Sequence, residues 1–186
     1  MHTPVNYFAN PENAEDTLKQ VKEAGGEGII VQGDMTKEED TLRLIEEACF
    51  AYGEKIDGLV NVAGGLVARK TIEEMDVEFW DFIMDVNAKT AFLATKAAVS
   101  KMTDGGSVVN FSSQAARDGG GPGATAYASS KAAVMTFTRA MAKELGPKKI
   151  RVNAVCPGLI NTSFHDRFTK NKCGCRYTLA PGRRPC

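Results

Sequence analysis

Tyr127 and Lys131 are the pair of side chains whose types and spacing could move a proton. They lie four residues apart in a segment that predicts a helix, so both project from one face, one turn apart. The pKa of an isolated phenol is about 10, and a close ammonium favours the phenolate by about 1 to 3 units. Taken alone, however, this spacing is more often a solvated lysine beside a half-buried tyrosine.

Further polar residues fall where predicted strands end. Ser112 and Ser113 follow an apolar run, at the carboxyl edge where a parallel sheet binds its ligands. A serine that caps a turn would show the same pattern. Asn87 lies inside an otherwise apolar helical segment, so its amide needs partners. Pro157 and Thr162 follow the last predicted strand, so that four polar sites converge on one edge of the sheet.

The elements that must position these residues alternate between strands and helices. Thr36 and Glu39 have the spacing of a capping box at a helix start. Strands that are apolar on both faces and alternate with helices predict an α/β fold, with a parallel sheet covered by helices on both faces. The predicted strands span 3–8, 27–33, 56–62, 107–112 and 150–155, and the predicted helices span 11–24, 37–52, 77–102 and 124–145.

Length and composition indicate one globular domain. The chain has 186 residues, of which 43% are hydrophobic, enough for a sizeable core. Lys and Arg together number 23, as do Asp and Glu, so the chain has no global basic field for nucleic acid. Neither a signal peptide nor a membrane span is visible in the sequence.

The five cysteines indicate a reduced environment rather than a disulfide framework or a metal site. Their number is odd and nothing marks a secreted chain, which favours the cytoplasm. Cys173 and Cys175 are separated by one residue instead of the usual two, and His165 is the only histidine nearby. We therefore expect no metal.

Taken together and in order, these motifs resemble the short-chain dehydrogenase/reductase family in its single-domain form. The resemblance runs from Asp34 to Thr162, most of the chain. Val62 stands where the family's Asn-Asn-Ala-Gly motif commonly has its second Asn. The matching residues are Asp34-Met35-Thr36, Asn61-Val62-Ala63-Gly64, Asn87, Ser113, Tyr127 with Lys131, and Pro157-Gly158 with Thr162.

The resemblance implies a catalytic role for four residues. Tyr127 would be the general acid/base that exchanges a proton with the substrate oxygen as a nicotinamide exchanges hydride with its carbon. Lys131 would lower the pKa of Tyr127 and bind the nicotinamide ribose. Ser113, rather than Ser112, would polarise the substrate oxygen, and Asn87 would hold a water in the proton relay.

The resemblance also implies a cofactor site. Asp34 would accept from the adenine amino group, although an acid that caps the following helix is the alternative. Absence of an acid from Asn6-Tyr7-Phe8 favours NADP, with NAD possible. The cofactor-binding residues implied by the resemblance are Asp34, Met35, Asn61, Ala63, Gly64, Tyr127, Lys131, Pro157, Gly158 and Thr162.

Compared with the family, the chain is predicted to be truncated at both ends. The fold would be a Rossmann-like doubly wound parallel sheet that lacks the first strand and its Gly-rich turn. That strand would have lain between the strands at 3–8 and 56–62, so we expect a groove there. Residues 1–169 would form the incomplete domain, and residues 170–186 an atypical basic tail, disordered or non-native.

Two functions from different classes remain open. The first is an NAD(P)-dependent oxidoreductase that interconverts a secondary alcohol and a ketone. The second is a non-catalytic relative, a fragment or an association-only subunit, unable to bind cofactor. The resemblance also implies a homo-oligomer formed through the helices near 77–102 and 124–145. The expected partners are a small carbonyl or alcohol substrate, without nucleic acid or membrane.

Overall fold

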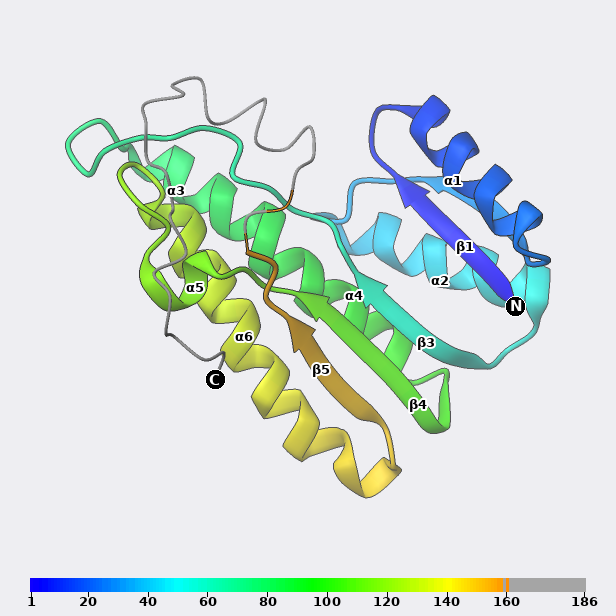
Figure 1. Ribbon diagram of the computed structural model, residues 1–186. Helices are drawn as coiled ribbons and strands as arrows, with labels where there is room; N and C mark the ends of the chain where they lie inside the picture. Colours follow the sequence, from blue (N-terminus) through cyan, green and yellow to red (C-terminus); the bar gives the residue numbers. More distant parts are fainter. Residues whose placement is uncertain (159, 161–186) are drawn as a thin grey trace, which may run out of the picture.

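The chain alternates strands and helices along its length (Figure 1). The computed structural model describes residues 1–158 and 160. Each predicted strand and helix has a counterpart, which confirms the α/β class. The elements are β1 (His2–Tyr7), α1 (Pro11–Glu23), β2 (Glu27–Gln32), α2 (Glu38–Tyr52), β3 (Ile56–Asn61), α3 (Val77–Met84), the π-helix η1 (Asp85–Lys89), α4 (Thr90–Val99), β4 (Met102–Phe111), α5 (Ala115–Asp118), α6 (Thr125–Leu145), the 3-10 helix η2 (Gly146–Lys148) and β5 (Arg151–Val155).

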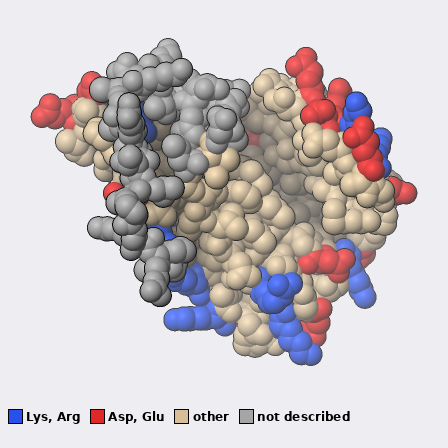
Figure 2. Space-filling view, in the orientation of Figure 1, with Lys and Arg blue, Asp and Glu red and all other residues tan. Residues whose placement is uncertain are grey.

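The strands form two parallel sheets. One consists of β1 and β2, and the other has the order β3-β4-β5. Among the described residues no ladder joins β1 to β3, so each of these strands has one unpaired edge. The surface is hollowed between the two sheets (Figure 2). This gap between β1 and β3 lies where the family resemblance predicted a groove.

Helices α4 and α6 cover one face of the β3-β4-β5 sheet. Side chains alternate along a strand, so Leu59, Val108 and Val152 point toward these helices and build a core with Leu145 and Ile150. The opposite face carries Val60 and Val155, which are 59% and 41% exposed. Figure 2 shows an uncharged surface over the carboxyl-terminal halves of these strands.

The smaller sheet lies between α1 and α2 (Figure 1). Pro11 occupies the first turn of α1, where its missing N–H is not needed, and Gly25 follows the helix with a φ of 79°. Helix α2 packs against α4 through Ile45, Cys49 and Ala98, and this contact links the two sheets.

Two local predictions need correction. The helical region predicted at 77–102 runs from 77 to 99, but the π-helix η1 separates α3 from α4, and residue 102 begins β4. Thr36 and Glu39 form no capping box: the N-cap of α2 is Lys37, which makes no side-chain capping bond. The Thr36 hydroxyl donates instead to Asp34 Oδ1 at 2.7 Å. In the described part of the chain, no helix is long and apolar enough to cross a membrane.

Candidate functional site

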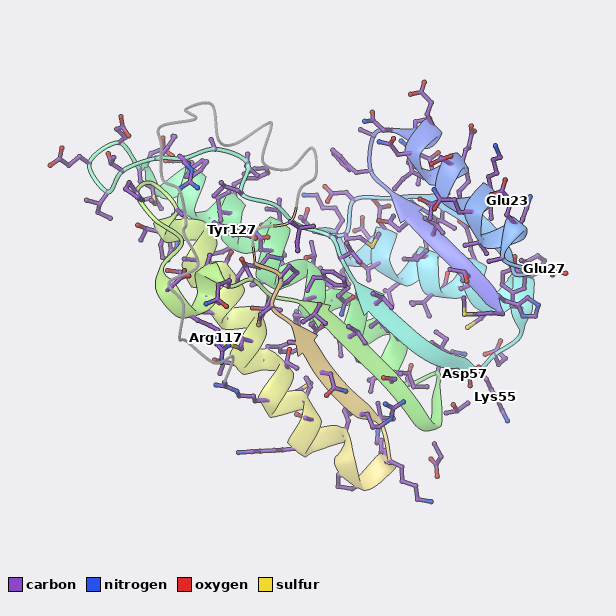
Figure 3. The ribbon with its side chains drawn as sticks, viewed as in Figure 1. Glu23, Glu27, Lys55, Asp57, Arg117 and Tyr127 are labelled. Carbon is purple, nitrogen blue, oxygen red and sulfur yellow. The ribbon has the colours of Figure 1, made fainter. Side chains whose placement is uncertain are left out.

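The carboxyl end of β4 meets helix α6. Phe111 is the last residue of the strand, and Ser112 and Ser113 follow it directly. Tyr127 lies near the arrowheads of β4 and β5, whereas Lys55 and Asp57 mark the opposite edge of the sheet (Figure 3). The structure therefore brings Ser113, Tyr127 and Lys131 to the edge predicted from the sequence.

The Tyr127 hydroxyl lies in a partly buried position beside Ser113. Burial raises the pKa of the Tyr127 phenol above its usual value, and a side-chain hydrogen bond with Ser113 lowers it only in part. The resemblance implies that Lys131 lowers this pKa; in the structure burial is the largest cause of the shift, and Ser113 is the group that lowers the pKa. Tyr127 is thus held as a protonated phenol at neutral pH.

Lys131 is buried, with 5% of its surface exposed. Its ammonium donates to the carbonyl oxygen of Phe111 at 2.8 Å and lies 6.0 Å from the centroid of the Tyr127 ring. Desolvation lowers the pKa of Lys131 from 10.5 to about 8, since a charged ammonium is costly in an apolar surrounding. The amine is therefore still mostly charged at pH 7.

The two serines face different partners. Ser113 Oγ accepts from the backbone N–H of Ala115 at 3.1 Å and bonds with Tyr127. Ser112 Oγ is buried and donates to the carbonyl oxygen of Lys131 at 2.7 Å. Of the two serines, Ser113 is thus the one that lies next to the phenol.

Asn87 braces the turn after β3. Its Oδ1 accepts from Gly65 N–H at 3.0 Å, and its Nδ2 donates to the carbonyl oxygens of Gly65 and Ile83, both at 3.0 Å. Gly64 has a φ of 134°, and a Cβ there would overlap Asn87 Oδ1. Glycine is therefore required at this position, because of its backbone conformation and because Asn87 fills the place of a Cβ. Ala63 and Gly64 are exposed.

Asn61 and Asn110 form a polar chain inside the larger sheet. Asn61 Nδ2 donates to Asn110 Oδ1 at 2.8 Å and to Thr95 Oγ1 at 3.2 Å. Asn110 is fully buried, and its Nδ2 donates to Thr138 Oγ1 on α6 at 2.9 Å. The amide of Asn61 is therefore engaged within the protein. Asn110 was missed in the sequence, although an amide at an inward position of an apolar strand was a signal.

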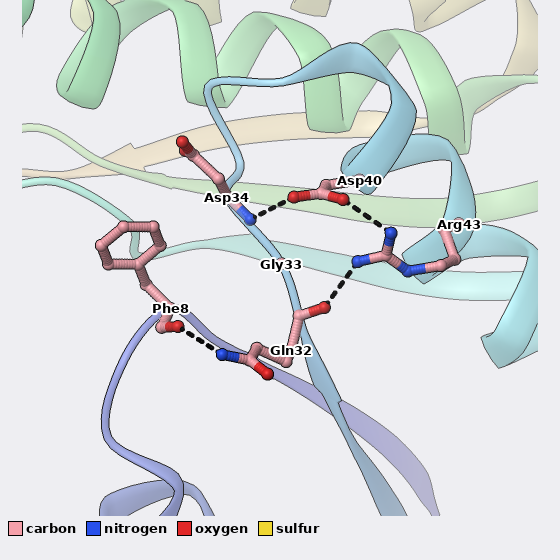
Figure 4. A pocket seen from close by; sticks show the side chains of 6 residues that line it. All are labelled: Phe8, Gln32, Gly33, Asp34, Asp40 and Arg43. Carbon is pink, nitrogen blue, oxygen red and sulfur yellow. Dashed lines mark hydrogen bonds and ion pairs between the residues drawn. The ribbon is translucent and has the colours of Figure 1, made fainter.

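A cavity of about 240 Å³ opens between the ends of β1 and β2. Asp34 and the 69% exposed ring of Phe8 lie on it (Figure 4). The N–H of Asp34 donates to Asp40 at 2.7 Å, and this bond, with help from Arg43, holds the pKa of Asp40 below its usual value. The sequence did not predict that Phe8 lines a cavity, because a single aromatic residue at the end of a strand forms no recognisable pattern. Figure 4 also includes Gln32 and Gly33, which complete the lining.

The remaining residues expected to bind the cofactor include Asp34, Met35 and those that follow β5. Asp34 Oδ1 accepts from the N–H and the hydroxyl of Thr36 at 2.9 and 2.7 Å, an Asx turn before α2. Met35 is buried as a whole residue, with 8% of its surface exposed. The Pro157 carbonyl accepts from Gln114 N–H at 3.0 Å. Ala63 and Gly158 are exposed, and Thr162 lies outside the described residues.

The chain matches the family described as short chain dehydrogenase over residues 3–172. It belongs to this family. Hydroxynaphthalene reductase-like protein Arp2 of Metarhizium brunneum (strain ARSEF 3297) is 35% identical over 87% of the chain. Short-chain dehydrogenase/reductase GME11373 of Pestalotiopsis microspora is 32% identical, also over 87% of the chain. The chain spans 60% and 61% of the length of these two relatives.

Solved structures of family members have the same Rossmann-like architecture. A dehydrogenase/reductase from Sinorhizobium meliloti 1021 superposes with a TM-score of 0.82 at 32% identity, over 87% of this chain and 63% of that one. The NADH-dependent reductase A1-R′ in complex with NAD superposes with a TM-score of 0.78 at 35% identity, over 85% of this chain and 68% of that one. Family membership also supports a nicotinamide cofactor.

Proposed function

We propose that the chain carries the proton-transfer and substrate side of an NAD(P)-dependent oxidoreductase that interconverts a secondary alcohol and a ketone. The contact between the Tyr127 hydroxyl and Ser113, one helical turn from the Lys131 ammonium, is the observation that carries this proposal. The names of the two relatives, a reductase-like protein and a dehydrogenase/reductase, support the same reaction class.

The residues present fit both ends of a nicotinamide dinucleotide. Asp34 supplies a carboxylate acceptor in a cavity that Phe8 also lines, which suits a planar ring with an exocyclic amine. Gly64 is exposed, so its backbone is accessible where the adenosine half would approach. Tyr127 and Lys131 would contact the nicotinamide ribose, with Pro157, Gly158 and Thr162 near the carboxamide. When bound, the cofactor supplies or removes the hydride.

The proton chemistry belongs to the chain itself. Tyr127 is protonated at neutral pH, because the pKa of a phenol is about 10 and burial raises it further, so it can donate to a carbonyl oxygen that becomes an alkoxide. The hydroxyl of Ser113 can donate to the same oxygen and orient it. The Lys131 ammonium stabilises the phenolate left behind, since charges interact strongly in a site with little water. Asn87 would hold the water through which the phenolate regains its proton, and it would do so through an oxygen atom, because both hydrogens of its amide are bound to Gly65 and Ile83.

NADP is proposed as the preferred cofactor, with NAD possible. The end of β1 presents Asn6, Tyr7 and Phe8, so no carboxylate is available there for the ribose diol. Asn6 Nδ2 donates to the carbonyl oxygens of Val31 and Gly33 at 3.2 and 3.1 Å and serves the β1-β2 contact instead. Titration with NADPH and NADH separately distinguishes the two cofactors.

A homo-oligomer is proposed through α4 and α6. An apolar groove of about 360 Å³ runs between the two helices. Phe92 is 46% exposed there and meets Phe137 edge to face, with centroids 6.4 Å apart. An exposed aromatic groove favours burial against a second copy. The substrate would be a small carbonyl or alcohol compound, and the cytoplasm remains the predicted location.

The test is a cofactor-dependent melt followed by turnover assays. A cooperative melt that NADPH or NADH raises, together with reduction of ketones from a varied panel, is the expected result. Tyr127→Phe should abolish turnover and spare the cofactor-dependent shift in melting temperature. Tyr52→Phe is the matched control, because Tyr52 stacks on His2 far from the site, with ring centroids 4.5 Å apart.

A melt that neither cofactor changes would contradict the proposal. It would favour the second function, a non-catalytic family member that associates with other chains. Residues 1–169 are proposed as one incomplete domain. Residues 170–186, proposed as a separate basic tail, lie outside the described residues.

A further inference from the structure

Phe111 and Ser112, at the carboxyl end of β4, form hydrogen bonds with the side chain and with the backbone of Lys131. Its ammonium donates to the Phe111 carbonyl oxygen at 2.8 Å. Its own carbonyl oxygen accepts from Ser112 Oγ at 2.7 Å. Lys131 and Ser112 are 5% and 4% exposed, so water offers little competition for either bond.

Ser112 is itself fixed to the sheet. Its backbone N–H donates to the Val155 carbonyl oxygen of β5 at 2.9 Å, while its side chain reaches α6. One residue therefore ties the backbone of α6 to β5 at the helical turn that carries Lys131. The next tie between β4 and α6 is the bond from Asn110 to Thr138, two turns farther along the helix.

Three consecutive residues thus match three consecutive requirements of the site. The Phe111 carbonyl oxygen accepts from the Lys131 ammonium, and the Ser112 hydroxyl donates to the Lys131 carbonyl oxygen. The Ser113 hydroxyl forms a hydrogen bond with the Tyr127 phenol. A shift of α6 relative to β4 would change the first and third contacts together. Of these three contacts, the one made by Ser112 joins a side chain to the backbone of α6, and it involves neither the Lys131 ammonium nor the Tyr127 hydroxyl.

We propose that Ser112 is a positioning residue, which through its bond to the Lys131 carbonyl fixes where the Lys131 ammonium and the Tyr127 hydroxyl lie relative to Ser113. The part of this inference that concerns turnover rests on the proposed function. The part that concerns the Lys131 ammonium does not, because it can be measured in the chain without a substrate.

The test compares Ser112→Ala with Ser130→Ala. Ser130 is a fully buried serine of the same helix whose hydroxyl donates to the Tyr127 carbonyl oxygen at 2.8 Å, so its loss removes a buried hydroxyl without touching the strand. The lysine ε-carbons are labelled with ¹³C and titrated by NMR, with Lys131→Arg identifying the Lys131 signal. The wild-type signal should titrate near pH 8.

In Ser112→Ala, we expect the midpoint of the Lys131 titration to rise by about one pH unit, because a displaced helix admits water to the amine. Ser130→Ala should change it by less than about 0.3 units. In an active chain, the alkaline limb of the pH profile of kcat should move in the same direction while KM for cofactor changes less than about twofold.

Ser112→Cys separates packing from hydrogen bonding, because a thiol fills the site but is a weak donor. It should behave like Ser112→Ala, and it replaces that variant if Ser112→Ala does not fold. An unchanged Lys131 titration in both variants, or a wild-type titration restored by the thiol, would overturn the proposal. A shifted titration in a chain that turns over no substrate would support Ser112 as a positioning residue and contradict the proposed function.

Discussion

Replacing Lys131 with methionine should make the protein more stable while removing its proposed activity. Desolvation lowers the pKa of Lys131 from 10.5 to about 8, a difference of about 2.5 units. At 1.36 kcal/mol per unit, holding the charged amine in the folded chain costs about 3 kcal/mol at pH 7. Methionine fills a similar space without a charge.

One lost contact offsets part of this gain. Lys131→Met leaves the Phe111 carbonyl without its donor, a loss of about 1 kcal/mol. The net expectation is a variant more stable by about 2 kcal/mol at pH 7, or about 6 °C in melting temperature for a chain of this size.

The advantage should depend on pH in a defined direction. Between pH 8 and 10.5 the unfolded chain binds more protons at this lysine than the folded chain does, so wild-type stability rises with pH in that window. Near pH 10 the cost of the buried amine falls to about 1 kcal/mol, which the lost hydrogen bond balances. Wild type and Lys131→Met should therefore be about equally stable there.

Urea unfolding at pH 7, 8.5 and 10 measures these differences directly. Lys143→Met, an exposed lysine near the end of the same helix, is the control and should change stability by less than about 0.5 kcal/mol. Lower stability of Lys131→Met at pH 7, or a difference independent of pH, would refute the assignment of Lys131 as a desolvated ammonium.

Three further changes test other parts of the structure. Gly64→Ala should cost about 3 kcal/mol in urea unfolding because its Cβ would overlap Asn87, whereas Gly65→Ala meets nothing within 4 Å and serves as its control; equal losses would contradict this reasoning. Asn110→Ala should cost about 2 to 3 kcal/mol in the same measurement, since it strands buried polar partners, and a neutral result would show that water replaces them. Phe8→Ala should weaken AMP binding in calorimetry about threefold to tenfold and Phe8→Trp should retain it; equal affinities would remove Phe8 from the cofactor site.

The sequence predicted the strands well where they are apolar runs bounded by turn residues. β2, β3 and β5 each lie within one residue of their predicted bounds. β4 begins at Met102 rather than at residue 107 because Met102 pairs with Ile56 of β3. The register shifts between this pair and the next one, Gly58 with Ser107, so the extension is irregular and only the tertiary pairing at its start marks it as strand.

The sequence predicted that Tyr127 and Lys131 lie close together, but not what the Lys131 ammonium binds. The spacing of Tyr127 and Lys131 placed both on one helical face, which the structure bears out. The partner of the Lys131 ammonium is the Phe111 carbonyl, a backbone atom that has no signature in the sequence. The π-helix at Asn87 was likewise invisible, because the amide bonds to Gly65, a residue 22 positions away.

Because the strands form two separate sheets, we expect the two parts of the molecule to unfold with different free energies. Because no ladder crosses from β1 to β3 among the described residues, unfolding of β1, α1 and β2 breaks no hydrogen bond of the larger sheet. The packing of α2 on α4 through Ile45, Cys49 and Ala98 is then the main energetic link between the two parts. Native-state hydrogen exchange should resolve two units, with amides of β1 and β2 opening at a lower free energy than those of β4.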